Sequence, residues 1–352
     1  MGKEISEANK KRILYIDALN VLAILAVLLL HHNGIVFTFS NHFSWYTSLV
    51  VECVFYYAVP VFVMISGAML MGYREKYDTK SFFKKRVAKV LIPAIFWIVF
   101  VIIWRVFIVK TMVIDDWSFT NVMNIVFLNK AEFIYYYLFL IMGVYLTMPV
   151  LSRLAKPEYK KTLWYIVGVF FIFNALLPNL LELVGVSYNT NLGLMMGTYA
   201  MYAVLGYLLS TTDVPKKYRI ILYCLAILLV ICRYAATAVL SVEAGSLVKF
   251  AWGYGQFHAI ILASAVFVFV KNMKFSWLKK HERIINFLGK LAVCSFGVYL
   301  VHKIVMYYEV KWFGVDEASI WWRTIGALLT YGVSVLIVLI MKKIPVLKRL
   351  VP

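Results

Sequence analysis

Long apolar segments constrain the fold of this chain more than any other feature. A helix needs about 20 apolar residues to cross the hydrocarbon core of a bilayer. Because backbone polar groups must be satisfied within lipid, such segments span as helices. The sequence therefore predicts one all-α polytopic membrane domain over 1–352, with about ten transmembrane helices and no soluble domain. Ten segments qualify, near 13–34, 45–72, 91–110, 132–154, 162–181, 194–212, 219–241, 247–270, 288–308 and 320–341.

The composition excludes several other classes of protein. The chain is 63% hydrophobic and 15% charged, whereas soluble domains are about 45–50% apolar and about 25% charged. A soluble enzyme, a disordered chain and a disulfide scaffold are excluded on this ground. We do not expect the first segment to be a cleaved signal peptide, because it is too long and carries Asp17 and Asn20.

The positive charge follows the membrane segments. The net charge is +19, which invites an interpretation as a nucleic-acid-binding protein. However, 28 of the 36 Lys and Arg residues lie in segments on one side of the predicted spans. This is the positive-inside pattern, and it predicts two cytoplasmic termini and membrane lipids, not nucleic acid, as partners.

Polar residues in the first span lie on one face. At 100° per residue, Asp17, Asn20 and His31 share a face, and Asn20 and His31 are about 16 Å apart along the axis. Intramembrane ionisable residues usually face protein or a water-filled cavity. The stripe therefore indicates either a functional site or hydrogen bonding between helices.

The second span contains a lone carboxylate, Glu52, at the predicted depth of His31. Glu52 indicates either a site residue or a structural ion pair with an outer Lys or with Arg323. Further along this span, Pro60 predicts a kink. Ser66 and Gly67 then suit close helix packing.

The ninth span and the inner side contain further candidates. Ser295 and His302 lie about 20° apart on the helical wheel, and His302 falls at the depth of His31. Alternatively, His302 is a helix-end histidine that anchors the span at the membrane–water interface. Arg86 and Lys89 end a predicted basic amphipathic helix over 79–90. They suit either the phosphates of a cytosolic ligand or ordinary lipid headgroups.

Other residues have no assigned role. Arg105 and Arg233 are intramembrane cations for which structural pairing is the default, and His258 lies in the eighth span. The four cysteines, Cys53, Cys224, Cys232 and Cys294, lie in apolar segments and form no CxxC pair. We therefore expect no disulfide framework and no metal site.

Four stretches, taken in order, carry a resemblance to a known family. They are DALNVLAILAVLLLHH, then FVMISGAML followed by FFKKRVAKVLIP, then YLFLIMGVYLTMPVL, and finally SFGVYLVH. From Arg12 to about Lys343 the chain resembles the acyltransferase-3 family of integral-membrane acyltransferases. This family includes O-acetyltransferases of bacterial surface polysaccharides. Each stretch alone is weak, but four in the right order on ten spans are fairly specific.

The resemblance implies a reaction. A cytosolic acyl-CoA, such as acetyl-CoA, would donate an acyl group to a hydroxyl of an extracytoplasmic or lipid-linked glycan at the bacterial plasma membrane. His31 would be the general base, Glu52 would orient its imidazole, and His302, Ser295 or a backbone N–H would stabilise the oxyanion. The residues expected to contact the donor are Arg86, Lys89, Asp17, Asn20 and Ser66.

The sequence departs from the family pattern at three places. Asn20 stands where the family usually has arginine, and Lys89 stands where its second arginine is expected. The His-x-W that often precedes the fourth-span motif is here Ile134 and Tyr136. The first two departures bear on the contacts with acyl-CoA, and the last bears on the acceptor.

An alternative function is a transporter, flippase or exporter of a glycan or small metabolite, with the buried charges along its pathway. We find no inverted repeat that would favour it. The identity of the acceptor, the length of the acyl chain and the oligomeric state stay open. So does the participation of a separate extracytoplasmic protein.

Overall fold

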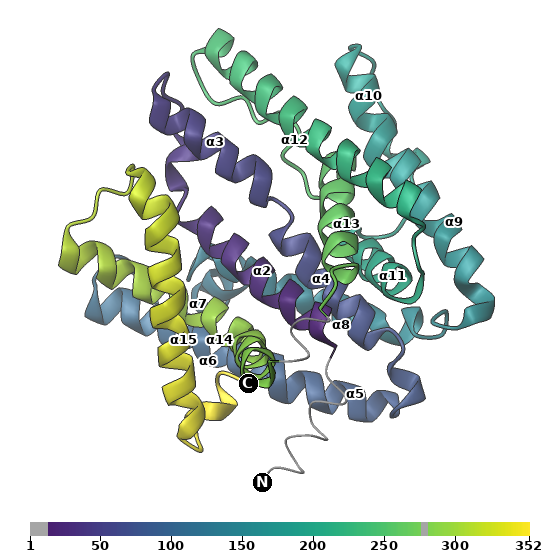
Figure 1. The fold of residues 1–352 in the computed structure, drawn as a ribbon. Helices are drawn as coiled ribbons and strands as arrows, with labels where there is room; N and C mark the ends of the chain where they lie inside the picture. Colours follow the sequence, from purple (N-terminus) through teal and green to yellow (C-terminus); the bar gives the residue numbers. More distant parts are fainter. Residues whose placement is uncertain (1–12, 276–280) are drawn as a thin grey trace.

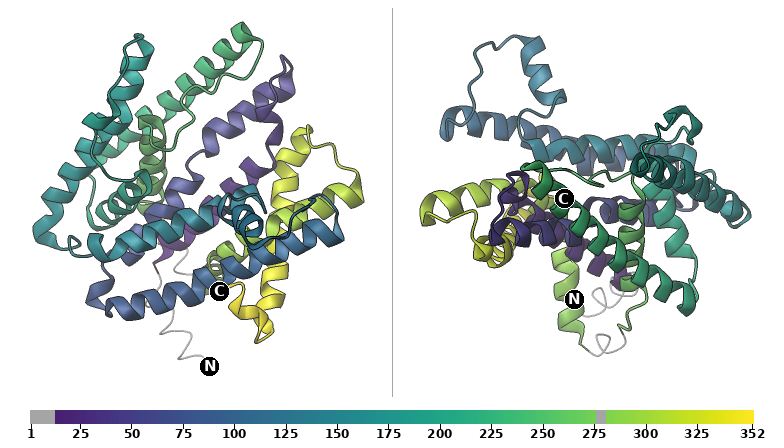
Figure 2. Two further views of the ribbon diagram at one scale, coloured as in Figure 1. Left: turned by 180° about the vertical axis from the view of Figure 1, so that it is seen from behind. Right: turned by 90° about the horizontal axis from the view of Figure 1, so that it is seen from above.

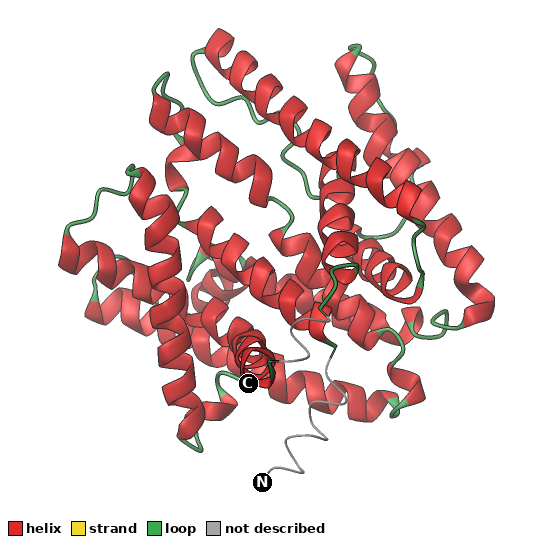
Figure 3. Cartoon of the chain, viewed as in Figure 1, coloured by secondary structure: helices red, strands yellow, loops and turns green. Residues whose placement is uncertain are grey.

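The computed structural model describes residues 13–275 and 281–352. Every regular element in these two ranges is a helix, and none is a strand (Figure 3). Residues 1–12 and 276–280, which contain six of the 28 Lys and Arg residues predicted on the inner side, lie outside the described residues.

The helices agree with most of the predicted spans. Eight helical segments in the described ranges are long and apolar enough to cross a membrane. The all-α membrane class is confirmed, while the count of ten spans and the cytoplasmic termini stay predictions. The α-helices are α2 (Leu14–His31), α3 (Phe43–Phe55), α4 (Ala58–Leu70), α5 (Thr79–Arg86), α6 (Ile92–Ile103), α7 (Phe119–Phe127), α8 (Tyr136–Leu151), α9 (Lys160–Phe170), α10 (Leu177–Leu183), α11 (Thr198–Thr211), α12 (Lys216–Ala244), α13 (Phe257–Lys271), α14 (Glu282–Phe313) and α15 (Ala327–Lys343).

The kink predicted from Pro60 is present. α3 ends at Phe55 and α4 begins at Ala58, so the break falls at Tyr56 and Tyr57. A proline ring clashes with the carbonyl four residues earlier, which here is that of Tyr56. The two halves of this span therefore meet at an angle near its middle.

The helix α2 lies in the centre of the bundle (Figure 1). It packs against α4, α14, α13 and α15, and Figure 2 shows the surrounding helices from two further sides. Its apolar face is buried, with Leu19, Ile24 and Leu28 fully enclosed. Because α2 is central, its polar face lies against other helices of the protein and not against lipid.

The helices α4 and α11 approach each other through glycines. A Cβ added to Gly67 would lie 1.9 Å from the carbonyl oxygen of Ala203, and one added to Gly206 would lie 2.0 Å from that of Met64. Small residues allow such backbone contact between membrane helices. Gly67 therefore serves packing.

The outer surface of the bundle is apolar. On α12, exposed side chains include Ile220, Ile221, Ile227, Leu228 and Ile231. An exposed apolar surface of this extent on a soluble monomer would be unusual. It suits contact with lipid chains.

The basic amphipathic helix expected over 79–90 is α-helical only to Arg86. A turn of π-helix, η3 (Val87–Leu91), then joins it to α6, where Pro93 stands near the start. At the other end, Asp78 caps α5 by accepting a hydrogen bond of 3.0 Å from the backbone N–H of Ser81. The hydrogen bonds with Ser81 hold the pKa of Asp78 below its ordinary value, so this carboxylate is ionised at neutral pH.

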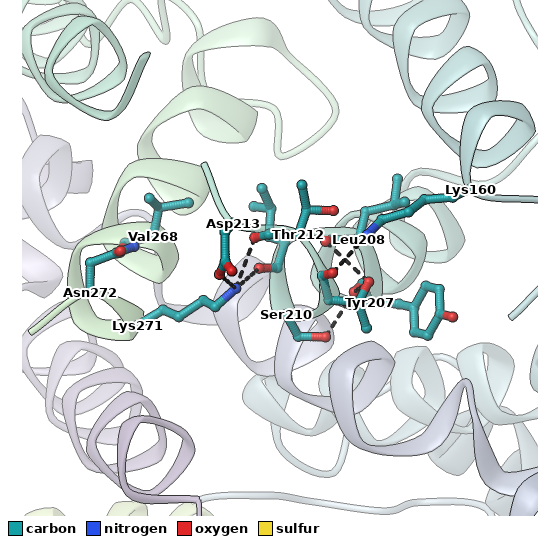
Figure 4. Close-up of polar contacts among 11 residues, drawn as sticks. Lys160, Tyr207, Leu208, Ser210, Thr212, Asp213, Val268, Lys271 and Asn272 are labelled. Carbon is teal, nitrogen blue, oxygen red and sulfur yellow. Dashed lines mark hydrogen bonds and ion pairs between the residues drawn. The ribbon is translucent and has the colours of Figure 1, made fainter. Parts of the chain in front are cut away.

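Two lysines fasten the end of α11 to its neighbours (Figure 4). Lys160 donates to the carbonyl of Thr211 at 2.7 Å, and Lys271 donates to those of Leu209 and Thr212 at 2.9 and 2.8 Å. Cations at a helix C-terminus complement its unpaired carbonyls and its dipole. Both lysines belong to segments predicted on the inner side.

The eighth predicted span, 247–270, is wrong in its first part. The helix α13 begins only at Phe257, and the preceding residues form turns and irregular chain. Side-chain hydroxyls satisfy the carbonyls of this segment: Tyr56 donates to Trp252, Tyr202 to Tyr254 at 2.7 Å, and Thr237 to Phe250 at 3.4 Å. Non-helical chain is tolerated at membrane depth when other parts of the protein satisfy its backbone carbonyls, as these hydroxyls do. A hydropathy profile does not detect such partners.

Candidate functional site

A cavity of about 640 Å³ runs beside the polar face of α2. His31 and Glu52 line one end, and Asn20, Ser66 and Lys89 line the other. Since Asn20 and His31 lie eleven residues apart on one helix, the cavity extends about 16 Å along it. With Ser295, six of the nine residues predicted for the site thus line a single cavity. We refer below to its His31 end and its Lys89 end.

The middle of the cavity is apolar. Aliphatic and aromatic side chains from α2, α4, α8 and α14 form this section, among them Val27, Leu30, Phe62, Ile65, Ile141 and Phe296. A chain-like ligand could lie along it with its polar groups at the two ends. Ligand sites commonly combine an apolar lining with a few placed polar groups.

A pair of histidines marks the His31 end. Nδ1 of His31 lies 2.7 Å from Nε2 of His302. Nδ1 of His302 in turn faces the backbone carbonyl oxygens of Tyr299 and Val298 at 2.8 and 3.1 Å. His302 is buried and does not itself line the cavity in the described part of the chain.

These contacts determine the tautomers of the two neutral rings. A carbonyl oxygen only accepts, so Nδ1 of His302 carries the proton and its Nε2 has a lone pair. His31 must therefore donate from Nδ1, which leaves a lone pair on its own Nε2. An imidazole held in this way is arranged as a base.

Glu52 has a different partner from the one expected. Its carboxylate Oε1 lies 3.7 Å from Nη2 of Arg233, whose Nη1 also donates to the Glu52 carbonyl at 3.4 Å. The guanidinium lies 4.0 Å above the ring of Tyr56. Arg323 instead donates to the Thr47 hydroxyl at 3.0 Å. The hydrogen bond of the His31 ring goes to His302 and not to Glu52, while Glu52 lines the same end of the cavity.

The irregular segment before α13 contributes Tyr254 to the cavity wall. The rings of Tyr254 and Tyr56 stack at 4.5 Å between centroids. Tyr136, which stands within the departure from the family pattern, also lines this end. Aromatic side chains therefore line this end of the cavity together with His31, and hydropathy gave no indication of them.

The Lys89 end brings together the inner candidates. Lys89 belongs to the π-helical turn η3 and lines the cavity. Arg86 lies just beyond it, with its guanidinium 5.5 Å from the ring of Tyr145, and its Nε is buried without a hydrogen-bond partner. The hydroxyl of Tyr145 lies beside both Arg86 and Ser66. Asp17, one turn before Asn20, is not among the described residues that line the cavity.

A second polar chain lies behind the His31 end. Nδ1 of His32 is 2.8 Å from the Leu28 carbonyl, and its Nε2 is 2.9 Å from the Thr330 hydroxyl, which bonds the carboxylate of Glu309. Because a helix turns about 100° per residue, His32 points away from the face that carries His31. This network ties the end of α2 to α14 and α15.

The residues without assigned roles behave differently from one another. Arg105 donates to the carbonyl of Ala131 at 2.8 Å and so has a structural partner. Arg233 pairs with Glu52 as described above. His258 is buried beside Tyr56, and both of its ring nitrogens are without hydrogen-bond partners in the described structure.

No group of three or more His, Cys, Asp or Glu side chains suited to a metal ion occurs within residues 13–275 and 281–352. The four cysteines are free thiols. The polar side chains that line the cavity or lie directly behind it include two imidazoles, a paired carboxylate, hydroxyls and cations. Such groups can bind an anionic ligand at the Lys89 end and remove a proton at the His31 end.

Comparison with known proteins identifies the family. Searches of curated proteins and of solved structures gave no match. A family model described as an acyltransferase domain matches residues 13–339, nearly the whole chain. The match includes every candidate residue named above. On this evidence the chain is a membrane acyltransferase of the acyltransferase-3 family.

Proposed function

We propose that this protein transfers an acyl group, with acetyl as the first candidate, from a cytosolic acyl-CoA to a hydroxyl of an extracytoplasmic or lipid-linked glycan in a bacterial cell membrane. The observation that carries the proposal is the single cavity that joins His31 to Lys89 past an apolar middle section. Its two ends match the two chemistries that such a transfer requires.

The donor would enter at the Lys89 end. Lys89 and the guanidinium of Arg86, whose Nε is an unpartnered buried donor, suit the phosphates of CoA. The pantetheine arm would follow the apolar section past Ser66 and Asn20, with Asp17 at the same end of α2. The thioester would then reach His31 while the phosphates stay at the inner mouth.

The chemistry would take place at the His31 end. Nε2 of His31 removes the proton of the acceptor hydroxyl as its oxygen attacks the thioester carbonyl. His302 positions this imidazole through the 2.7 Å hydrogen bond. Glu52, held by Arg233, accepts a hydrogen bond from a neighbouring hydroxyl of the glycan. Collapse of the intermediate breaks the C–S bond, and the CoA thiolate takes the proton from His31.

Single-turnover transfer from radiolabelled acetyl-CoA in proteoliposomes, with extracted cell-envelope glycan as acceptor, tests the proposal. Wild type should label the glycan. His31→Ala should lower the rate by about 10²–10⁴-fold, which is the usual contribution of a general base. Arg86→Ala should raise the KM for acetyl-CoA, while Lys84→Ala, an exposed change on the same helix, should not.

Failure to bind or turn over several acyl-CoAs in well-folded wild type would refute the proposal. The transport alternative would then be favoured, because a cavity with polar ends also suits a pathway for a glycan or metabolite. Uptake of labelled glycan by the same proteoliposomes would measure it.

A further inference from the structure

Lys303 is a cation at the His31 end that the mechanism above does not use. It follows His302 on α14 and lines the same cavity as His31 and Glu52. On this helix Ser295, Tyr299 and Lys303 recur at four-residue intervals and all line the cavity. Lys303 therefore lies on the cavity face of α14, while His302 lies behind that face.

The ammonium of Lys303 has no ion-pair partner within the described structure. No hydrogen bond or ion pair joins it to any described residue. The side-chain carboxylate at this end of the cavity, that of Glu52, is already paired with Arg233 at 3.7 Å. The ammonium of Lys303 is close enough to both His31 and His302 to interact with them electrostatically. The His31 end thus holds a cation without an ion-pair partner beside the proposed base.

The other candidates for stabilising an oxyanion are poorly placed. His302 directs its Nε2 lone pair at His31 and its Nδ1 proton at backbone carbonyls, so it has no free N–H. Ser295 precedes Lys303 by eight residues and is therefore about 12 Å away along the helix axis. Its hydroxyl bonds the carbonyl of Leu291 at 3.3 Å.

We propose that the ammonium of Lys303 stabilises the oxyanion of the tetrahedral intermediate, which makes Lys303 a catalytic residue. This inference rests on the proposed acyl transfer. When the acceptor oxygen bonds to the thioester carbon, the carbonyl π electrons move onto its oxygen and the acceptor proton moves to Nε2 of His31. The oxyanion then lies in a site with two cations, imidazolium and ammonium. Its electrons re-form the carbonyl as the thiolate leaves with the proton from His31.

The test compares Lys303→Met and Lys303→Arg in the single-turnover assay. Removal of one oxyanion donor costs about 10²–10³-fold in kcat, and we expect this loss for Lys303→Met. Lys303→Arg keeps the charge and should stay within about tenfold of wild type. The Kd of a CoA thioether, a donor analogue that cannot form the oxyanion, should be unchanged in both variants.

The matched control is Lys311→Met, the same change two turns further along α14. Lys311 lies 5.8 Å from the ring of Tyr307 and does not line the cavity in the described residues, so its kcat should equal that of wild type. Lys303→Gln, which keeps a polar side chain, is a second variant for use if Lys303→Met purifies unfolded.

Three results would overturn the inference. The first is an unchanged kcat in folded Lys303→Met or Lys303→Gln. The second is a raised KM for the glycan with kcat retained, which would assign Lys303 to an anionic group of the acceptor. The third is a lower affinity for the CoA thioether that accounts for the whole loss. Inactivity of the wild type itself would instead refute the proposed function, so the two failures are distinguishable.

Discussion

The contact between α4 and α11 supports a quantitative prediction about Gly67→Ala. The added Cβ would lie 1.9 Å from the carbonyl oxygen of Ala203, and ordinary contact begins at 3.4 Å, so the helices must separate by about 1.5 Å. The Cβ is fixed directly to the backbone of α4, and the carbonyl belongs to the backbone of α11. Neither can rotate away as the end of a flexible side chain would. We expect destabilisation at the upper end of the ~1–3 kcal/mol range for overpacking.

The same displacement should reach the site. Ser66, the neighbour of Gly67, lines the cavity at the Lys89 end. A misplacement of about 1 Å can lower an enzymatic rate by about 10²-fold. Gly67→Ala should therefore lower both the melting temperature in detergent and the single-turnover rate with acetyl-CoA.

Gly143→Ala provides the matched control. Gly143 lies within α8, and a Cβ there would meet nothing within 4 Å. This variant should melt at or above the wild-type temperature, because alanine favours helix over glycine. Equal melting temperatures and equal rates for Gly67→Ala and Gly143→Ala would refute the packing argument.

Three further predictions concern the histidine pair, the buried ion pair and the fastening of α11. His302→Phe should lower kcat by about 10²–10⁴-fold with an unchanged KM for acyl-CoA, as expected for an orienting group; a raised KM would contradict this. Arg233→Met should destabilise the fold by about 3–5 kcal/mol because it leaves the buried carboxylate of Glu52 without its ion-pair partner. Adding Glu52→Gln should restore much of the lost stability, measured by thermal unfolding. Lys271→Met should lower the melting temperature, since the lysine donates to two carbonyls; exposed Lys274→Met should not, and equal effects would be evidence against the fastening.

Apolar length and helical periodicity predicted most of the fold, because lipid leaves a chain few ways to satisfy its backbone. The first predicted span, 13–34, contains α2 (Leu14–His31). Pro60 predicted the break between α3 and α4 from local sterics alone. The start of the eighth span failed because tyrosine hydroxyls distant in sequence satisfy its carbonyls, and no local pattern encodes those partners.

The candidate site could likewise be predicted from the sequence only in part. Asn20 and His31 could be placed together because they lie on one helix. The contact of His31 with His302 joins residues 271 positions apart, and that of Arg233 with Glu52 joins residues 181 positions apart. Helical wheels give the face of each residue but not which faces meet. Lys303 is one of the eight Lys and Arg residues outside the inner segments, and its place in the cavity follows only from the packing of α14 beside α2.

The apolar middle of the cavity also bears on proton leakage across the membrane. In any membrane that holds a proton gradient, a continuous column of water between the two faces would conduct protons and dissipate that gradient. Apolar constrictions resist such wetting, and the apolar side chains of Val27, Phe62 and Ile65 line the cavity here. The same side chains that would hold a pantetheine arm would thus keep the membrane impermeable to protons between turnovers.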